Sequence, residues 1–153
     1  MMNERAFNDH HKIEFPPMHT AEHILNQTMV QMFGCSRSKN AHIERKKSKL
    51  DYELKQEPTK EQVAEIERRV NEVIDRHLPV TYEFVPLQDA AKIVDLSKLP
   101  EGTEAPLRLV RIGNYDVCAC IGQHVGNTSE IGHFIILNHD FKEGCWRMRF
   151  RLE

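Results

Sequence analysis

The first third of the chain contains a segment with the hydrophobic spacing of an α-helix. Residues 18–33 contain no glycine or proline and are followed by Gly34, a residue typical of helix C-termini. Their hydrophobic side chains fall within one arc, at Ile24, Leu25, Thr28, Met29 and Met32. We predict a helix here, with His19 and His23 on the side opposite this arc, in a polar cleft rather than in the core.

A second helix is predicted to end before Pro79. Thr59 and Gln62 have the spacing of a capping box, in which two side chains satisfy free backbone N–H groups at a helix start. The inward-facing positions then recur with helical spacing, at Val63, Ile66, Val70, Val73, Ile74 and His77. Between the two helices the chain is polar and basic, with one short predicted strand around Leu50, Tyr52 and Leu54.

The second half of the chain changes to the period of β-strands. Hydrophobic runs predict strands around residues 80–84, 107–112, 134–137 and 146–150. In the last run Trp146, Met148 and Phe150 alternate with Arg147, Arg149 and Arg151. One face of that strand should therefore be buried and the other charged. The pattern as a whole predicts an α+β fold in which two main helices pack on a mainly antiparallel sheet.

The composition is that of an ordinary globular protein. Of 153 residues, 40% are hydrophobic and 29% are charged, and the formal net charge of −2 excludes a general attraction to nucleic acid or membranes, although not local patches. A chain of this length can bury a core without disulfides, so we expect residues 1–153 to form one domain. The four cysteines show no disulfide framework, and no segment predicts a signal peptide or membrane span. We expect a cytoplasmic protein with reduced cysteines.

Two pairs of metal-binding residue types lie about a hundred residues apart. His19 and His23 are four residues apart, so on a helix both rings project from one face. Cys120 and His124 flank a glycine, which lets the backbone turn so that both side chains point the same way. Imidazole and thiolate are the donors that zinc favours in tetrahedral sites. We therefore predict a site for zinc, or a similar divalent ion, on these four residues. Cys118 is the alternative thiolate, but it has no histidine at the matching spacing.

These motifs resemble those of a known family. The chain reads H-T-A-E-H from His19 and C-I-G-Q-H-V-G-N-T-S-E-I-G from Cys120, similar to the zinc motifs of the alanyl-tRNA synthetase editing domain and its free-standing relatives, the AlaX-type trans-editing proteins. Residues 49–52 (K-L-D-Y) and 66–71 (I-E-R-R-V-N) resemble two further family segments. The resemblance runs from about residue 15 to about residue 136. No glycine-rich barrel precedes the first motif, so the chain looks like the short form.

The resemblance implies a fold, a cofactor and a reaction. The fold is that of the second additional domain of alanyl- and threonyl-tRNA synthetases, with zinc bound by His19, His23, Cys120 and His124. The implied reaction is hydrolysis, in trans, of the ester that joins serine or glycine to the tRNA for alanine. The metal would orient the amino group or carbonyl of the substrate, or lower the pKa of the attacking water. The implied partner is therefore tRNA, bound by its acceptor end.

The residues expected to contact the amino acid depart from the family pattern. The usual C-G-G-T-H is here C-I-G-Q-H, with Ile121 and Gln123 at the changed positions. Our candidates for substrate binding are Gln123, Thr128 and Ser38, the last from the loop 36–42, where the family places groups that sort serine from alanine. These changes are compatible with metal binding, but they leave the preferred amino acid open.

A basic segment follows the first predicted helix. Residues 37–49 contain six basic residues and one acid. We expect this segment to contact the phosphate backbone of tRNA, with Lys46 and Lys47 as candidates, and the alternative is a solvated loop. The arginines of the last strand either extend this surface or form the solvent face of an edge strand.

Two other functions fit part of the pattern. H-T-A-E-H also matches the H-x-x-E-H of inverted zinc peptidases, with Glu22 as general base, although that class needs a further carboxylate ligand. A structural zinc site in an RNA-binding module fits the four ligands as well. A chain long enough to fold without metal counts against the structural site.

Overall fold

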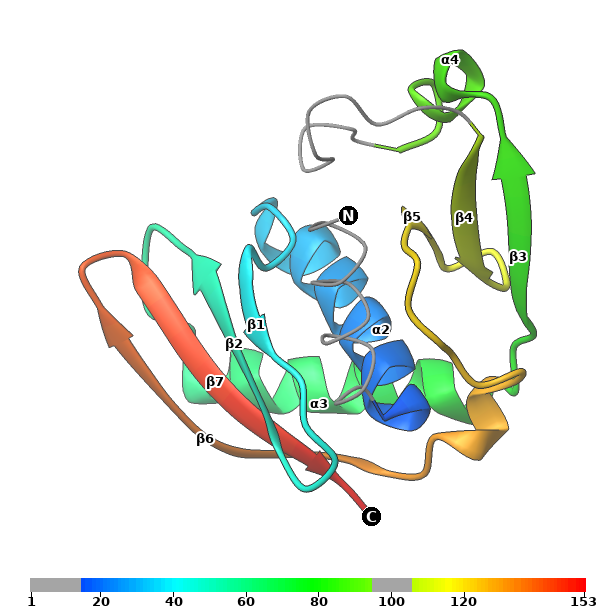
Figure 1. The fold of residues 1–153 in the computed structure, drawn as a ribbon. Coiled ribbons are helices and arrows are strands. Elements are labelled where there is room, and N and C mark those ends of the chain that lie inside the picture. The colour runs from blue at the N-terminus through cyan, green and yellow to red at the C-terminus, as the bar shows by residue number, and fades with distance from the viewer. Residues whose placement is uncertain (1–14, 95–105) are drawn as a thin grey trace.

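A computed structural model describes residues 15–94 and 106–153, so residues 1–14 and 95–105 of the predicted domain lie outside the described part. Two antiparallel sheets flank a central helix (Figure 1). The four-stranded sheet has the order β1 (Asn40–His42), β2 (Ser48–Glu53), β7 (Cys145–Leu152) and β6 (Phe134–Lys142). The three-stranded sheet has the order β3 (Val80–Val85), β4 (Leu107–Ile112) and β5 (Asp116–Ala119). The predicted α+β fold with antiparallel strands is confirmed, but the strands form two sheets rather than one.

The two predicted helices are present, and local sequence fixes their ends. Helix α2 (Pro16–Phe33) begins two residues earlier than predicted, because its two prolines occupy the first turn, where a missing N–H costs nothing. It ends at Gly34, whose φ of 66° lies in the left-handed region and whose N–H donates to the carbonyl oxygen of Val30. Helix α3 (Lys60–Asp75) starts with the predicted capping box of Thr59 and Gln62. Short helices α4 (Leu87–Ala90) and η1 (Thr128–Glu130) complete the described elements. None of the helices in residues 15–94 and 106–153 has the length and hydrophobicity to cross a membrane.

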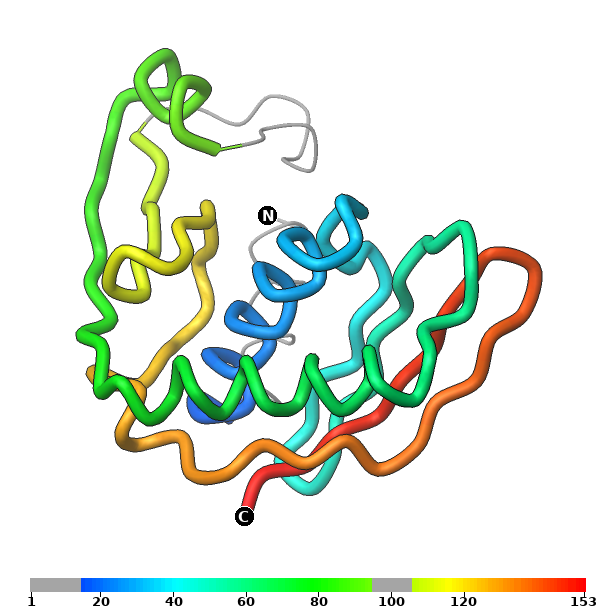
Figure 2. The backbone as a smooth tube through the Cα atoms, turned by 180° about the vertical axis from the view of Figure 1, so that it is seen from behind, coloured from blue at the N-terminus to red at the C-terminus, as the bar shows by residue number. Residues whose placement is uncertain are grey.

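Helix α2 is buried on nearly all sides because it lies between the two sheets. Helix α3 crosses it and also packs on β6 and η1, as the view from behind shows (Figure 2). One hydrophobic core joins α2 and α3 to both sheets, and large side chains such as Trp146 and Ile24 are fully buried in it. Burial of each such side chain contributes about 1.5–3 kcal/mol to stability. A smaller hydrophobic cluster on the opposite face of the three-stranded sheet packs against α4.

Strand β7 is central, which excludes the alternative that its arginines form the solvent face of an edge strand. Its hydrophobic residues are buried and its arginines lie on the other face, as predicted, but the strand pairs with both β2 and β6 and is not an edge. Arg147 forms an ion pair with Asp51 on β2, with Nε 2.8 Å from Oδ1. The arginine row is therefore partly neutralised within the sheet.

Candidate metal centre

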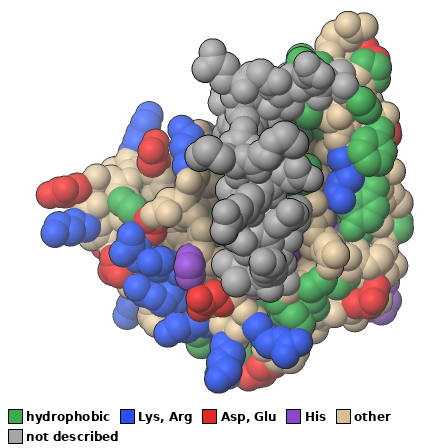
Figure 3. Space-filling view, in the orientation of Figure 1, with side chains coloured by type: hydrophobic (Ala, Val, Ile, Leu, Met, Phe, Trp, Pro, Cys, Tyr) green, Lys and Arg blue, Asp and Glu red, His purple; other side chains and the backbone are tan. Residues whose placement is uncertain are grey.

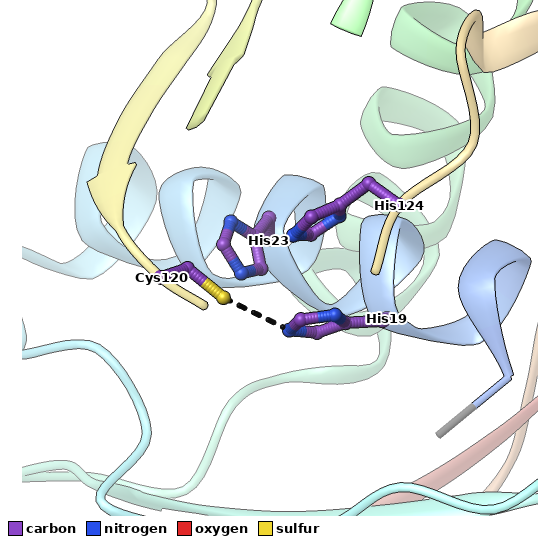
Figure 4. Close-up of side chains that lie close together, drawn as sticks. All are labelled: His19, His23, Cys120 and His124. Atoms are coloured by element: carbon purple, nitrogen blue, oxygen red, sulfur yellow. Dashed lines mark hydrogen bonds between the residues drawn. The ribbon is translucent and has the colours of Figure 1, made fainter. Parts of the chain in front are cut away.

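The four predicted ligands converge at one place. His19 and His23 come from α2, while Cys120 and His124 come from the segment that follows β5. One ligand atom from each residue lies within 4.8 Å of the others, and the side chains point toward a shared space (Figure 4). Nε2 of His19 is 3.3 Å from Sγ of Cys120. Two motifs a hundred residues apart thus form one group that could bind a metal ion.

Each imidazole presents its Nδ1 atom to a group outside the cluster. Nδ1 of His19 lies 3.0 Å from the carbonyl oxygen of Gln123, and Nδ1 of His124 lies 2.9 Å from Oγ1 of Thr20. Nδ1 of His23 faces Oδ2 of Asp116 at 3.7 Å. When Nδ1 carries the proton, the lone pair of Nε2 is available to bind a metal. In metal sites, residues that accept a hydrogen bond from the histidine commonly favour this arrangement.

The environment keeps His23 and His124 neutral. Burial lowers the pKa of His23 well below its ordinary value, and the neighbouring His124 and His19 lower it further. Burial, followed by His19 and Arg108, lowers the pKa of His124 to about 2. Nε2 of His124 is buried and has no hydrogen-bond partner within the described residues. A neutral imidazole with an unsatisfied buried nitrogen is suited to bind a metal ion.

Asp116 is a buried carboxylate behind the cluster that the sequence did not reveal. Its side chain is 2% exposed, and Arg37 donates to both of its oxygens, with Nη1 at 2.8 Å and Nη2 at 3.2 Å. Burial raises the pKa of Asp116, and the charge of Arg37 opposes this shift. The carboxylate therefore lies between a cation and His23, where its charge favours a proton on the nearby Nδ1, although the 3.7 Å separation is too long for a hydrogen bond.

The segment that holds Cys120 and His124 is anchored by two residues of the three-stranded sheet. Nε of Arg108 donates to the carbonyl of Cys120 at 2.8 Å, and Nη2 donates to the carbonyl of Gly122. The backbone N–H of His124 donates to the hydroxyl of Tyr82 at 3.2 Å. On α2, Thr20 accepts from the N–H of Val125 at 3.2 Å. These contacts position both ligands before any metal binds.

The histidines of α2 are more deeply buried than predicted. His19 and His23 lie opposite the hydrophobic arc, yet each is only 4% exposed because β5 and the following segment cover this side of the helix. The immediate surroundings of the histidines are nevertheless polar, as predicted, since Asp116 and Thr20 lie beside the cluster. The sequence could not show that a second sheet covers this side of α2.

The predicted substrate-binding residues lie in three different environments. The side chain of Gln123 is exposed, while its carbonyl accepts from His19. Ser38 is buried, and its N–H donates to Oδ1 of Asn26 on α2 at 3.1 Å. Thr128 is fully buried: its hydroxyl donates to Ile74 and accepts from the N–H of Leu78. We therefore withdraw Thr128 as a substrate contact, because its hydroxyl joins η1 to the end of α3.

Cys118 and Glu22, which alternative interpretations of the sequence would place in the site, lie outside the ligand group. Cys118, the alternative thiolate, is not part of it. Glu22 is near, with Oε1 3.9 Å from Nε2 of His19, but it is not part of the group either. The group thus contains a thiolate and no carboxylate, which favours the predicted ligand set over that of an inverted zinc peptidase.

Loss of charge at Asp116 should weaken metal binding. We expect Asp116→Asn to lower zinc affinity about 10- to 100-fold, because the variant no longer presents a negative charge to His23. Competition with a chromophoric chelator at fixed pH measures this affinity in the folded protein. Asp51→Asn is the matched control, since it removes a carboxylate paired with Arg147 in the other sheet. Equal affinities of the two variants would show that Asp116 does not orient His23.

Comparisons with known proteins agree with this geometry. Residues 107–148 match the family model of the threonyl and alanyl tRNA synthetase second additional domain. The chain is 31% identical over 145 residues to the alanine–tRNA ligase of Treponema denticola, an alignment that covers 94% of this chain and 24% of the ligase. It is 30% identical over 148 residues to the alanine–tRNA ligase of Methanococcus vannielii, covering 94% of this chain and 16% of the ligase.

A third relative, the alanine–tRNA ligase of Bacillus subtilis, is 30% identical over 131 residues, covering 85% of this chain and 15% of the ligase. The chain therefore spans a quarter or less of the length of these relatives. An alignment over 94% of the chain necessarily includes both ligand pairs, and the matched segment 107–148 contains Cys120 and His124. Sequence similarity and the converging motifs lead to one assignment: the chain belongs to the family of the threonyl- and alanyl-tRNA synthetase second additional domain.

Proposed function

We propose that this protein hydrolyses the ester of a mischarged aminoacyl-tRNA, with seryl- or glycyl-tRNA for alanine as substrate and zinc as the bound metal. The observation that most supports this proposal is the convergence of three imidazoles and one cysteine sulfur at the junction of α2 and β5. The relatives support it as well, because they are alanine–tRNA ligases.

The donor set fits zinc. Imidazole and thiolate are borderline to soft donors, whereas magnesium and calcium prefer oxygen ligands. Nε2 of His124 is buried without a hydrogen-bond partner in the described structure, and a cation there would satisfy it. When bound, zinc would position the amino or carbonyl group of the substrate or lower the pKa of the attacking water.

The residues of the chain itself supply orientation around this centre. Arg108 holds the backbone at Cys120, Thr20 and Tyr82 hold His124, and Asp116 faces His23. A site held by such contacts does not need to reorganise during the reaction. The exposed side chains of Ile121 and Gln123, beside the ligands, are our candidates for contact with the amino acid.

Release of amino acids from charged tRNA tests this function. We expect the protein to release labelled serine or glycine from the tRNA for alanine faster than it releases alanine. Removal of metal with a chelator should stop hydrolysis while the circular dichroism spectrum persists, because the shared core involves both sheets and both helices. His19→Ala should also abolish hydrolysis but bind tRNA almost as tightly, and His133→Ala, an exposed histidine beside the acidic helix α3 and outside the cluster, should behave as wild type.

Two results would contradict this proposal. The absence of release from all three charged tRNAs at full zinc occupancy would rule out the deacylase. Parallel loss of activity and secondary structure during chelation would instead favour the structural zinc site of an RNA-binding module.

The basic segment is our candidate for the tRNA backbone. Lys46 and Lys47 are exposed in the turn between β1 and β2, and basic side chains gather over this turn and the four-stranded sheet (Figure 3). Lys47 and Lys49 line a shallow pocket together with Arg149 of β7. Arg37 is not part of this surface, because it is paired with the buried Asp116.

Salt dependence tests this surface. Each neutralised phosphate releases condensed counterions, so Lys46→Ala and Lys47→Ala should each reduce the slope of log affinity against log salt by about one unit. Turnover of the saturated complex should change little, because such contacts act equally in ground and transition states. Lys60→Ala on the acidic helix α3 is the control and should keep the wild-type slope. An unchanged slope in the Lys46→Ala, Lys47→Ala double variant would mean that the segment is a solvated loop.

A further inference from the structure

Two aromatic side chains are exposed on the three-stranded sheet. Tyr82 and Phe84 alternate along β3 and are 45% and 68% exposed, respectively. Single exposed hydrophobic residues are common on protein surfaces and need no partner. These two side chains, however, share a face with a cation, and Tyr82 contacts His124 of the candidate metal centre, and this combination indicates a ligand.

The strand register places both rings on one face with Arg108. Tyr82 pairs with Val110, and Phe84 pairs with Arg108. Directly opposed residues of an antiparallel pair lie on the same face of a sheet. The guanidinium of Arg108 lies over the ring of Tyr82, 4.5 Å from its centroid. We call Tyr82, Phe84 and Arg108 the aromatic platform.

The platform faces the metal centre and is tied to it. Val110, on the same face, is fully buried in the core that contains α2. The hydroxyl of Tyr82 accepts from the N–H of His124, and the two rings are 6.4 Å apart. Arg108 donates to the carbonyls of Cys120 and Gly122. A ligand on the platform would therefore lie next to the segment that supplies two of the four metal ligands.

The charge of Arg108 remains available to an anion. Its hydrogen bonds go to backbone carbonyls, and no carboxylate of residues 15–94 or 106–153 forms an ion pair with it. Hydrophobic side chains with basic atoms among them are visible over the three-stranded sheet (Figure 3). An aromatic surface beside an uncompensated cation suits a ligand with a flat ring and a phosphate, which is the chemistry of an unpaired nucleotide.

We propose that the aromatic platform stacks the unpaired base of the 3′-terminal nucleotide whose ribose carries the ester. This inference rests on the proposed function, because it takes aminoacylated RNA as the substrate. The ester is attached to the terminal ribose, so its base must lie within one nucleotide of the reacting bond. The platform is at the corresponding place, because Tyr82 contacts His124, and Phe84 beside the Arg108–Tyr82 pair can stack any base because every base has a π-face.

A thermodynamic cycle between protein and RNA tests the platform. The probe is an RNA hairpin that has a single-stranded 3′ end and carries no amino acid. Its last nucleotide either has its base or is abasic, and fluorescence anisotropy measures binding. Removal of the base should weaken binding to the wild type about 5- to 150-fold. Phe84→Ala should weaken binding to the intact hairpin within the same range. In this variant the abasic hairpin should bind almost as well as the intact one, because the stacking contact is already lost.

Two further variants control this cycle. Leu137→Ala removes another exposed hydrophobic residue, 38% exposed on β6 of the other sheet, and should keep wild-type affinity. Phe84→Trp retains an aromatic ring and should keep the preference for the intact hairpin. Additive losses in the cycle, or no effect of base removal, would overturn the proposal. So would a wild-type dimer that Phe84→Ala dissociates, since this face would then bind a second copy of the chain.

The cycle is independent of hydrolysis. Coupling between Phe84 and the terminal base without ester hydrolysis would reject the deacylase but keep the platform. Hydrolysis without coupling would reject the platform and keep the deacylase.

Discussion

The packing of β5 and the segment after it against α2 is the contact on which the candidate site depends. It buries the side of α2 that bears His19 and His23 and brings Cys120 and His124 within reach of them. Without this contact the histidines of α2 would be solvated and two of the four donors would be absent. The hydrophobic residues of β4 and α2 that share the main core hold the two elements together.

Burial has a second consequence, which concerns charge. An imidazolium at this depth is unfavourable, so His23 and His124 stay neutral at physiological pH. The two rings therefore present lone pairs rather than charges to any metal ion. The carbonyl of Gln123 accepts from Nδ1 of His19 and so leaves Nε2 of that ring unprotonated, while Thr20 contacts Nδ1 of His124 and Asp116 faces His23. The fold thus holds the three rings in place beside Cys120.

Local patterns in the sequence were enough to predict both main helices, the capping box at Thr59 and the two residue pairs that converge in the structure, because each helix, cap or pair depends on residues close together in the chain. Contacts between distant segments were not predictable in this way. Arg37 was counted with a surface basic segment, but it pairs with Asp116, 79 residues away. Thr128 was predicted to bind substrate, but its hydroxyl joins η1 to the chain after α3. The division into two sheets, and the central place of β7, likewise depend on strand pairing across the whole chain.

X-ray absorption at the zinc edge of the zinc-loaded protein is the sharpest test of the proposal that Cys120 and three histidines bind a single zinc ion. We expect one sulfur neighbour at about 2.3 Å and three nitrogen neighbours at about 2.0–2.1 Å. Cys120→Ser should remove the sulfur contribution, whereas Cys118→Ser should leave it in place. A spectrum with only nitrogen and oxygen neighbours, or a sulfur signal that survives Cys120→Ser, would contradict the account.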